Sequence, residues 1–214
     1  MKYRNIFFDL DGTLADSADG VINSVMYALE KHGIQETDRN SLYRFIGPPL
    51  LDSFQRFYGF TPEETQCALA DYREYYSAKG IFENELTEGC VEMLTRLKTN
   101  GCRLFVCTSK PDRYTDEILR YFKIDTFFDG VFAASWDETL SLKSEILRIG
   151  LSTVGNQSES IMVGDRHHDI EGAIANGIDS IGILCGYGNR EELTKAGATY
   201  IVNDLSEVAD FILK

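Results

Sequence analysis

The sequence Asn5–Ser17, N-I-F-F-D-L-D-G-T-L-A-D-S, decides how the rest of the chain is interpreted. Its opening residues are mainly aromatic or β-branched, without polar alternation, which predicts a short and fully buried strand. Two carboxylates, Asp9 and Asp11, follow this strand at the end where open parallel sheets bind their ligands. Gly12 then permits a close backbone approach or a positive φ. Asp-x-Asp before glycine is equally typical of a solvated turn, so this motif alone leaves both interpretations open.

The composition is that of a globular protein of ordinary size. The chain has 214 residues, 43% of them hydrophobic and 26% charged, which suffices for one domain and a smaller insertion. Its net charge of -13 argues against a nucleic-acid polymer or an anionic membrane as a partner. No apolar stretch approaches the roughly 20 residues that span a bilayer, and we expect no secretory signal. The five cysteines are scattered without a C-x-x-C pair, so we expect reduced thiols and a cytoplasmic location.

Buried strands alternate with amphipathic helices through most of the chain. This pattern is typical of a doubly wound parallel sheet, a Rossmann-like α/β core. The expected strands are residues 5–8, 102–107, 130–134, 160–164, 180–184 and 200–202. The expected helices are residues 16–32, 42–46, 50–58, 61–79, 88–99, 113–122, 141–149, 170–176 and 207–213.

The helical stretch after the first strand is too long for an ordinary crossover. We therefore expect an inserted all-helical cap domain of residues 16–85, hinged near residues 14–17 and 81–87. The Rossmann-like core would then comprise residues 1–15 and 86–214.

Polar side chains follow four of the expected strands. They are Asp9 with Asp11, Thr108 with Ser109, Ser135, and Asp165 with Asp169. Because the carboxyl ends of parallel strands share one edge of a sheet, we expect these groups to meet in one crevice. Taken singly, the acids at 165 and 169 are also explained as helix N-terminal residues facing the helix dipole.

Carboxylates that meet without a partner repel one another and raise one another's pKa. A hard divalent cation with oxygen ligands keeps them ionised, and Mg²⁺ suits carboxylates, a carbonyl and water. The sequence therefore predicts a Mg²⁺ site at this edge of the sheet. The cation would also reduce the local repulsion between the negatively charged protein and an anionic substrate.

A metal-bound acid cluster beside hydroxyl groups suits phosphoryl transfer. One carboxylate can attack phosphorus and form an aspartyl-phosphate, while a second protonates the leaving oxygen and later deprotonates water. Thr108 or Ser109, the backbone N–H groups up to Gly12, and a lysine can hold the phosphoryl oxygens. Lys143 opens the helix after the third strand and Lys110 follows the hydroxyl pair, and the sequence leaves the choice between them open.

Four motifs resemble, in the same order, those of the haloacid dehalogenase-like hydrolase superfamily. They are D-L-D-G-T-L-A-D-S at Asp9–Ser17, C-T-S-K-P at Cys107–Pro111, Lys143, and V-G-D-R-H-H-D at Val163–Asp169. The helical insert is similar to the cap of the phosphoglycolate phosphatase-like subfamily, and the resemblance covers essentially the whole chain.

The resemblance implies that Asp9 is the nucleophile and Asp11 the general acid/base. It also implies that Mg²⁺ is bound by Asp9, the Asp11 carbonyl and Asp165, with Asp169 supporting the site. Thr108 would bind the phosphate.

Lys143 would join Thr108 in binding the phosphate, according to the same resemblance. Two positions depart from the family pattern. Ser144 follows Lys143 where proline is common, and Arg166 stands where a small hydroxyl residue is common.

Within the superfamily, Thr13 is similar to the phosphatase pattern, whereas a related mutase carries valine there. Asp11 argues against a dehalogenase, which has no leaving oxygen to protonate. The expected activity is hydrolysis of a small phosphomonoester such as phosphoglycolate. A 5′-nucleotidase, a sugar-phosphate phosphomutase and a non-catalytic phosphate-binding regulator remain alternatives.

Substrate choice is expected to come from the cap. Arg44, Gly47 and Pro48 form the best candidate for a loop that contacts the leaving group, since a rigid turn lies beside a cation. The same residues are equally explained as a helix-breaking turn. His167 and His168 are interpreted as polar loop residues, and the chain as a monomer or homodimer.

Overall fold

The computed structural model describes residues 1–137 and 139–214, and the chain divides into two compact units. The first, here called the sheet unit, comprises Met1–Asp16 and Leu86–Lys214. The second, here called the helical unit, comprises Ser17–Glu85 and is inserted into the sequence of the first. Among the described residues, no helix has both the length and the apolar character needed to cross a membrane.

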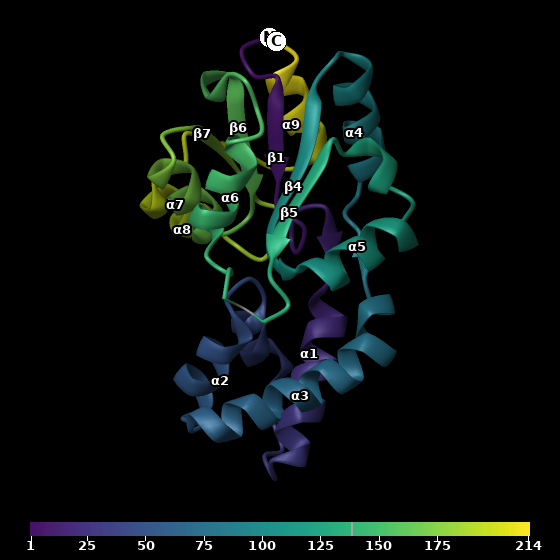
Figure 1. Cartoon of the computed structure of the whole chain (residues 1–214), viewed down its shortest axis with the longest axis vertical. Coiled ribbons are helices and arrows are strands. Elements are labelled where there is room, and N and C mark those ends of the chain that lie inside the picture. The colour runs from purple at the N-terminus through teal and green to yellow at the C-terminus, as the bar shows by residue number, and fades with distance from the viewer. Residues whose placement is uncertain (138) are drawn as a thin grey trace. The chain divides into compact units, whose positions relative to one another are not determined.

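The sheet unit is built on a six-stranded parallel sheet with the order β5-β4-β1-β6-β7-β8 (Figure 1). In that order the strands are Gly130–Ala134, Arg103–Pro111, Asn5–Phe8, Ser160–Gly164, Asp179–Ile183 and Tyr200–Val202. The strand order reverses at β1, because β4 and β5 lie on one side of it and β6, β7 and β8 on the other. Open parallel sheets bind their ligands at the carboxyl ends of the strands beside such a point. The predicted doubly wound α/β fold is confirmed.

Helices cover both faces of this sheet. They are α4 (Cys90–Thr99), α5 (Asp112–Tyr121), α6 (Lys143–Leu151), α7 (His167–Ala175), α8 (Arg190–Ala196) and α9 (Leu205–Ile212). Figure 1 shows α6, α7 and α8 on one side of the strands and α4 and α5 on the other.

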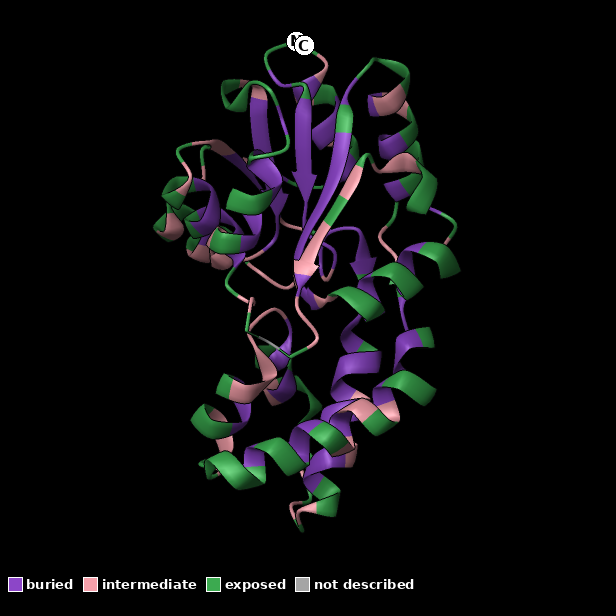
Figure 2. Ribbon diagram, viewed as in Figure 1, coloured by how far each residue is buried: buried purple, intermediate pink, exposed green. Residues whose placement is uncertain are grey.

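The core follows the central strands, where buried residues are continuous (Figure 2). Every residue of β1 is buried, as its apolar run predicts for a strand covered on both faces. The rings of Phe7 and Phe105 stack with their centroids 4.7 Å apart, and Met162 packs into the same cluster. Strand β1 is thereby fixed between β4 and β6, which sets the position of the residues that follow it.

The helical unit consists of three helices and two 3₁₀ turns. They are α1 (Ala18–Lys31), η1 (Arg39–Phe45), α2 (Leu50–Tyr58), α3 (Pro62–Ala78) and η2 (Gly80–Phe82). Helix α3 begins as its sequence predicts. Glu64 N donates to Thr61 Oγ1 at 3.2 Å and Thr61 N donates to Glu64 Oε2 at 2.8 Å, which forms a capping box.

The chain passes between the two units through a pair of two-residue strands. These are β2 (Ala15–Asp16) and β3 (Glu85–Leu86), which pair with each other as a separate small sheet. Close to them, Thr87 N donates to Leu14 O at 3.1 Å. Asp16 was expected to open a helix but lies in β2, and the helix begins two residues later.

Other elements also differ from the prediction. The short helix expected at residues 42–46 is the 3₁₀ turn η1, which begins at Arg39. Strand β4 does not end at Cys107 but runs on to Pro111, with a register shift between Thr108 and Pro111. Helix α7 begins at His167, three residues before its expected start, so the two histidines lie in its first turn and not in a loop. Helix α8 was not predicted at all.

Candidate active site

Three carboxylates from distant parts of the sheet unit meet in one buried cluster. Asp9 directly follows β1, Asp165 directly follows β6, and Asp169 lies in the first turn of α7. One carboxylate oxygen from each lies within 4.8 Å of the others, and the three residues are 6%, 0% and 0% exposed. Strand pairing explains the meeting of Asp9 and Asp165, because Phe8 of β1 lies in register with Val163 of β6.

Lys143, the first residue of α6, joins this cluster. Its Nζ lies 2.7 Å from Asp9 Oδ1 and 2.9 Å from Asp169 Oδ1, and it donates to Cys107 O at 3.1 Å. The Lys143 side chain is only 5% exposed, so the ammonium group is held by these three acceptors in a dry environment. Of the two candidate lysines, Lys143 is therefore the one paired with Asp9.

Lys110 is instead paired with Asp11. Its Nζ donates to both carboxylate oxygens of Asp11 at 2.9 Å, and both side chains are largely buried. The Asp11 carboxylate is thus not one of the three clustered carboxylates, although it lies close enough to Asp9 to raise the pKa of that residue. Asp9 and Asp11 lie two residues apart but have different ammonium partners.

Thr108 and Ser109, the two adjacent hydroxyl residues on β4, make different hydrogen bonds. Thr108 is 1% exposed and its Oγ1 accepts from Lys110 N at 3.2 Å, so it helps to fix the end of β4, which carries this lysine. The Ser109 hydroxyl donates to Ser141 O at 2.9 Å, in the loop that leads to α6. The sequence predicts that both residues follow a strand ending at Cys107. In the structure β4 continues to Pro111, so both residues lie within the strand.

Gly12 is required by the close packing at Asp165. Its φ is +79°, and a Cβ there would lie 2.4 Å from Asp165 Oδ2. A side chain at this position would meet both backbone strain and a clash with a carboxylate of the cluster. Gly12 N donates to Ala15 O at 2.8 Å, which closes the loop that follows Asp11.

The loop after β7 also holds Asp165, and sequence reasoning missed it. Tyr187 N donates to Asp165 Oδ2 at 2.7 Å, and the Tyr187 hydroxyl donates to Asp16 Oδ1 at 2.7 Å. Gly188 lies so close that a Cβ there would be 1.8 Å from Asp165 O. The available signal was G-Y-G at residues 186–188, two residues beyond a buried strand and at the sheet edge where the acids gather.

Asp169 both caps α7 and faces the cluster. Its Oδ2 accepts from Arg166 N at 3.1 Å, while its Oδ1 meets Lys143. Asp169 is therefore a helix N-terminal acid, as one interpretation of the sequence has it. The same side chain also pairs with Lys143 in the carboxylate cluster. Arg166, whose position departs from the family pattern, pairs through Nε with Glu192 Oε1 at 2.9 Å and links α7 to α8.

The residues expected to contact the leaving group lie in the helical unit. Gly47 has a φ of +102°, which favours glycine, and Pro48 follows it between η1 and α2. The Arg44 guanidinium lies over the Phe57 ring, 4.3 Å from its centroid, and 5.6 Å from that of Tyr58. These cation–π contacts give Arg44 a packing role within the helical unit.

Burial and mutual repulsion shape the electrostatics of the cluster. Burial, opposed by Lys143 and reinforced by Asp169, raises the pKa of Asp9 to about 6. Burial and the charges of Asp169 and Asp9 raise the pKa of Asp165 to about 8. For Lys143, burial alone would lower the pKa, but Asp169 and Asp9 outweigh it and raise the pKa above its ordinary value.

The charge balance of this region fits a divalent cation. Four carboxylates, those of Asp9, Asp11, Asp165 and Asp169, face two ammonium groups, those of Lys110 and Lys143. Two negative charges are left without a partner when all six groups are ionised. Carboxylate oxygens are the ligands that a hard cation such as Mg²⁺ prefers, so the donor set fits this ion.

The raised pKa values predict how stability depends on pH in the absence of metal. Unfolded carboxyl groups titrate near about pH 4. Because Asp9 and Asp165 titrate higher in the folded protein, these two groups bind more protons in the folded state between about pH 4 and about pH 8. Burial lowers the pKa of His168 to about 4, which opposes this effect below about pH 6.5 but is smaller than the combined shifts of the two carboxyl groups. The free energy of unfolding is therefore expected to fall as the pH rises through this window. Urea unfolding in EDTA at about pH 5 and about pH 8 measures the change.

Saturating Mg²⁺ is expected to reduce this fall, because the bound cation favours the ionised carboxylates of the folded state. Some carboxyl groups have a lowered pKa, such as Glu192, whose burial is outweighed by hydrogen bonds with His167 and Arg166 that lower its pKa to about 2. Their contribution to the free energy of unfolding is lost mainly below about pH 4, so they have little effect on the difference between about pH 5 and about pH 8. A metal-free stability that stays constant or rises between the two pH values would contradict the described electrostatics.

Comparison with known proteins assigns the family. The model of the haloacid dehalogenase-like hydrolase family matches residues 6–183. The chain is 40% identical to a 5′-nucleotidase of Pseudomonas aeruginosa, over 96% of this chain and 94% of the relative. It is 36% identical to the tyrosine-protein kinase PtkA of Mycobacterium tuberculosis, over 92% of this chain and 68% of the relative.

A solved structure agrees with this result. The crystal structure of a predicted phosphatase from Clostridium acetobutylicum superimposes with a TM-score of 0.95 at 43% identity, over 100% of this chain and 99% of that one. The names of the phosphatase and the nucleotidase agree with the expected class of enzyme, and the resemblance of the four motifs is confirmed. This chain belongs to the haloacid dehalogenase-like hydrolase family.

Proposed function

We propose that this protein is a Mg²⁺-dependent phosphomonoester hydrolase that forms an aspartyl-phosphate on Asp9. The observation that carries the proposal is the position of the Asp9 carboxylate, buried at the carboxyl end of β1 with Lys143 Nζ at 2.7 Å. A carboxylate in this setting is ionised by its ammonium partner and shielded from water, which are the conditions that a nucleophile needs.

In the first step an Asp9 oxygen forms a bond to phosphorus while the ester P–O bond breaks. Asp11 gives its proton to the leaving oxygen, and in the second step it takes a proton from the water that cleaves the aspartyl-phosphate. Asp11 is bound by Lys110 in the described arrangement, so this ion pair has to open before Asp11 carries a proton. The second step releases inorganic phosphate and restores the Asp9 carboxylate.

Phosphate oxygens would be held by Lys143, which supplies a buried cation, and by Thr108, which supplies a hydroxyl group. The N–H of Gly12 already donates to Ala15 O, so the expected contact of this N–H with the phosphate would require the turn to rearrange. Ser109 is anchored to Ser141 and is proposed to hold the loop in place.

Asp9, Asp165 and the Asp11 carbonyl would hold Mg²⁺, with Asp169 beside them. When bound, the ion neutralises charge that develops on the transferred phosphoryl group.

Residues 16–85, which are the helical unit and Asp16 before it, are proposed to act as a cap. The turn at Gly47 and Pro48 is proposed to contact the leaving group. Nucleoside 5′-monophosphates are favoured as substrates by the relative named a 5′-nucleotidase, which matches nearly the full chain. Phosphoglycolate is the second candidate. The five free cysteines accord with a cytoplasmic location. A monomer or homodimer is proposed as the oligomeric state.

A phosphate-release screen tests the activity and its substrate. With p-nitrophenyl phosphate, turnover is expected to require Mg²⁺ and to disappear in EDTA. The screen then compares nucleoside 5′-monophosphates, phosphoglycolate, sugar phosphates, pyrophosphate and a phosphotyrosine peptide under the same conditions. Sugar phosphates that are isomerised without phosphate release would indicate a mutase. Absence of turnover on every ester at saturating Mg²⁺ would leave a binding protein and contradict the proposal.

A further inference from the structure

A second group of metal-ligand side chains lies on α7, outside the carboxylate cluster. It consists of His167, His168 and Glu171, each of which offers one ligand atom within 4.8 Å of the other two. Atoms bound to one zinc ion lie about 3.3 Å apart when each bond is about 2.0–2.2 Å long, so each side chain would move by less than about 1 Å. The three residues are half-buried or exposed, and the site is open to an ion from solution.

The helix sets the geometry of this group. The interval from His167 to Glu171 is four residues and that from His168 to Glu171 is three, and both spacings place side chains on one face of an α-helix. The rings of the two histidines lie against each other with their centroids 3.8 Å apart. The sequence predicts that His167 and His168 lie in a loop, whereas both lie in the first turn of α7, which places them about one helical turn before Glu171.

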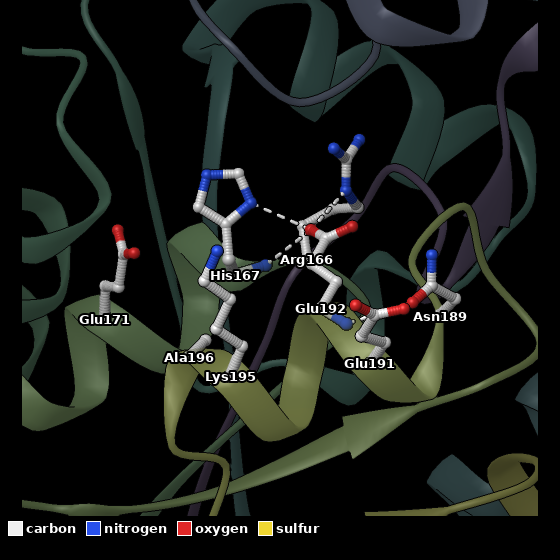
Figure 3. A pocket seen from close by; sticks show the side chains of 8 residues that line it. All are labelled: Arg166, His167, Glu171, Asn189, Glu191, Glu192, Lys195 and Ala196. Carbon is white, nitrogen blue, oxygen red and sulfur yellow. Dashed lines mark hydrogen bonds and ion pairs between the residues drawn. The ribbon is translucent and has the colours of Figure 1, made fainter.

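Glu192 orients one of the imidazoles. His167 Nδ1 lies 2.8 Å from Glu192 Oε1, and His167 N donates to the same oxygen at 3.0 Å. A carboxylate that accepts from one ring nitrogen leaves the lone pair on the other, and metal-binding histidines in proteins have this kind of partner. In Figure 3 the second nitrogen of His167 lies on the side of Glu171 in the view.

The surroundings favour a cation. A surface pocket of about 560 Å³ lies between α7 and α8 and reaches His167 and Glu171. Figure 3 shows His167 and Glu171 on α7 and the side chains of α8 opposite them. The charged side chains that line the pocket are Arg166, Glu171, Glu191, Glu192 and Lys195, which leaves one negative charge in excess.

We propose that His167, His168 and Glu171 bind a divalent transition-metal ion of the Zn²⁺ class. Two imidazoles and one carboxylate suit Zn²⁺, Cu²⁺ or Ni²⁺, whereas Mg²⁺ prefers oxygen ligands alone. The site is therefore chemically distinct from the carboxylate cluster. An ion bound there would fix the first turn of α7, which also carries Asp169, so the two sites share one structural element.

The imidazole signals of the protein test this proposal directly, because the chain contains only three histidines. Protein with its exposed Cys67 and Cys185 alkylated is titrated with Zn²⁺ in saturating Mg²⁺, and long-range ¹H–¹⁵N spectra of the imidazoles are recorded. We expect the signals of His167 and His168 to shift together at one equivalent, while His32 stays unchanged. Binding of Zn²⁺ to the carboxylate cluster does not produce this signature.

A matched pair of variants separates coordination from general charge. Glu171→Gln removes a proposed ligand, whereas Glu191→Gln removes the same charge from the same pocket without touching the group. We expect Glu171→Gln to weaken Zn²⁺ binding at least about tenfold and Glu191→Gln by less than about threefold. Both residues are exposed, so both variants are expected to fold, which circular dichroism checks.

Three results would overturn the proposal: unchanged signals of His167 and His168, a parallel shift of His32, or equal effects of the two variants. The outcome is independent of phosphatase activity, because the spectra report on the imidazoles and not on turnover.

Discussion

Asp9→Asn is expected to lower the turnover of p-nitrophenyl phosphate by at least about 10³-fold, the scale seen when a hydrolase loses its nucleophile. The amide is a poor nucleophile toward phosphorus, and it also withdraws a negative charge from the proposed Mg²⁺ site. Initial rates at saturating Mg²⁺ measure the change. Intact-protein mass spectrometry after an acid quench adds a second readout, since the wild-type chain is expected to carry a phosphoryl group and the variant none.

Asp210→Asn serves as the matched control for this substitution. Asp210 lies on α9 and pairs with Arg96 at 2.6 Å, and both side chains are well exposed. Its loss is expected to change turnover by less than about twofold, as for most surface substitutions. Metal-dependent turnover of Asp9→Asn near the level of the control would remove Asp9 as the nucleophile, provided that the far-UV circular dichroism of the two variants agrees.

Lys143→Met is expected to lower the free energy of unfolding of the metal-free protein by about 3–5 kcal/mol. The Lys143 side chain is 5% exposed and its ammonium is the partner of Asp9 and Asp169, so its removal leaves two buried carboxylates without a counter-charge. Saturating Mg²⁺ is expected to restore part of the loss, because a cation then returns to the cluster. Urea unfolding of both proteins in EDTA and in Mg²⁺ measures the two differences.

Lys98→Met provides the comparison. Lys98 Nζ pairs with Asp129 Oδ2 at 2.9 Å, but both side chains are about one-third exposed. A pair of this kind contributes about 0–1 kcal/mol, and Mg²⁺ should not change its effect. Similar losses in the two variants, or a loss in Lys143→Met that Mg²⁺ leaves unchanged, would contradict the described role of Lys143 in the cluster.

The strands of the sheet were the most predictable part of the fold. β1, β5, β6 and β8 have the bounds that their apolar runs predict. For β1 and β6, in which every residue is buried, the reason is that a strand covered on both faces shows as an uninterrupted hydrophobic stretch. The start of α3 was equally predictable, since Thr61, Pro62 and Glu64 supply a cap, a fixed φ and a reciprocal hydrogen bond within four residues. In each of these cases the decisive interactions are local.

Elements fixed by distant contacts were not predictable. Helix α8 has seven residues and a single buried one, Leu193, so its apolar periodicity is too weak to identify it. The start of α7 depends on the carboxylate of Asp169 reaching back to Arg166 N, and arginine is not a residue that indicates a helix start. The extension of β4 to Pro111 depends on its pairing with Ala134 of β5.

The same distinction applies to the site. Four polar groups at strand ends indicated the sheet edge where Asp9, Asp165 and Asp169 meet. The sequence could not choose between Lys143 and Lys110, because both follow a strand and only distances show that one pairs with Asp9 and the other with Asp11. The G-Y-G sequence marked the loop of Tyr187 but not its contact with Asp165, because that contact uses a backbone N–H that any residue except proline could supply.

The pairing of β2 with β3 has a consequence for how this architecture varies. The polypeptide departs from the sheet unit at Asp16 and returns at Leu86, and these two crossings are hydrogen-bonded neighbours. A segment whose ends are adjacent resembles a large hairpin loop, so its length and content can change without altering the order of the six parallel strands. Evolution can therefore exchange the inserted module for another while it preserves the acidic cluster, and new selectivity can arise without rebuilding the chemistry.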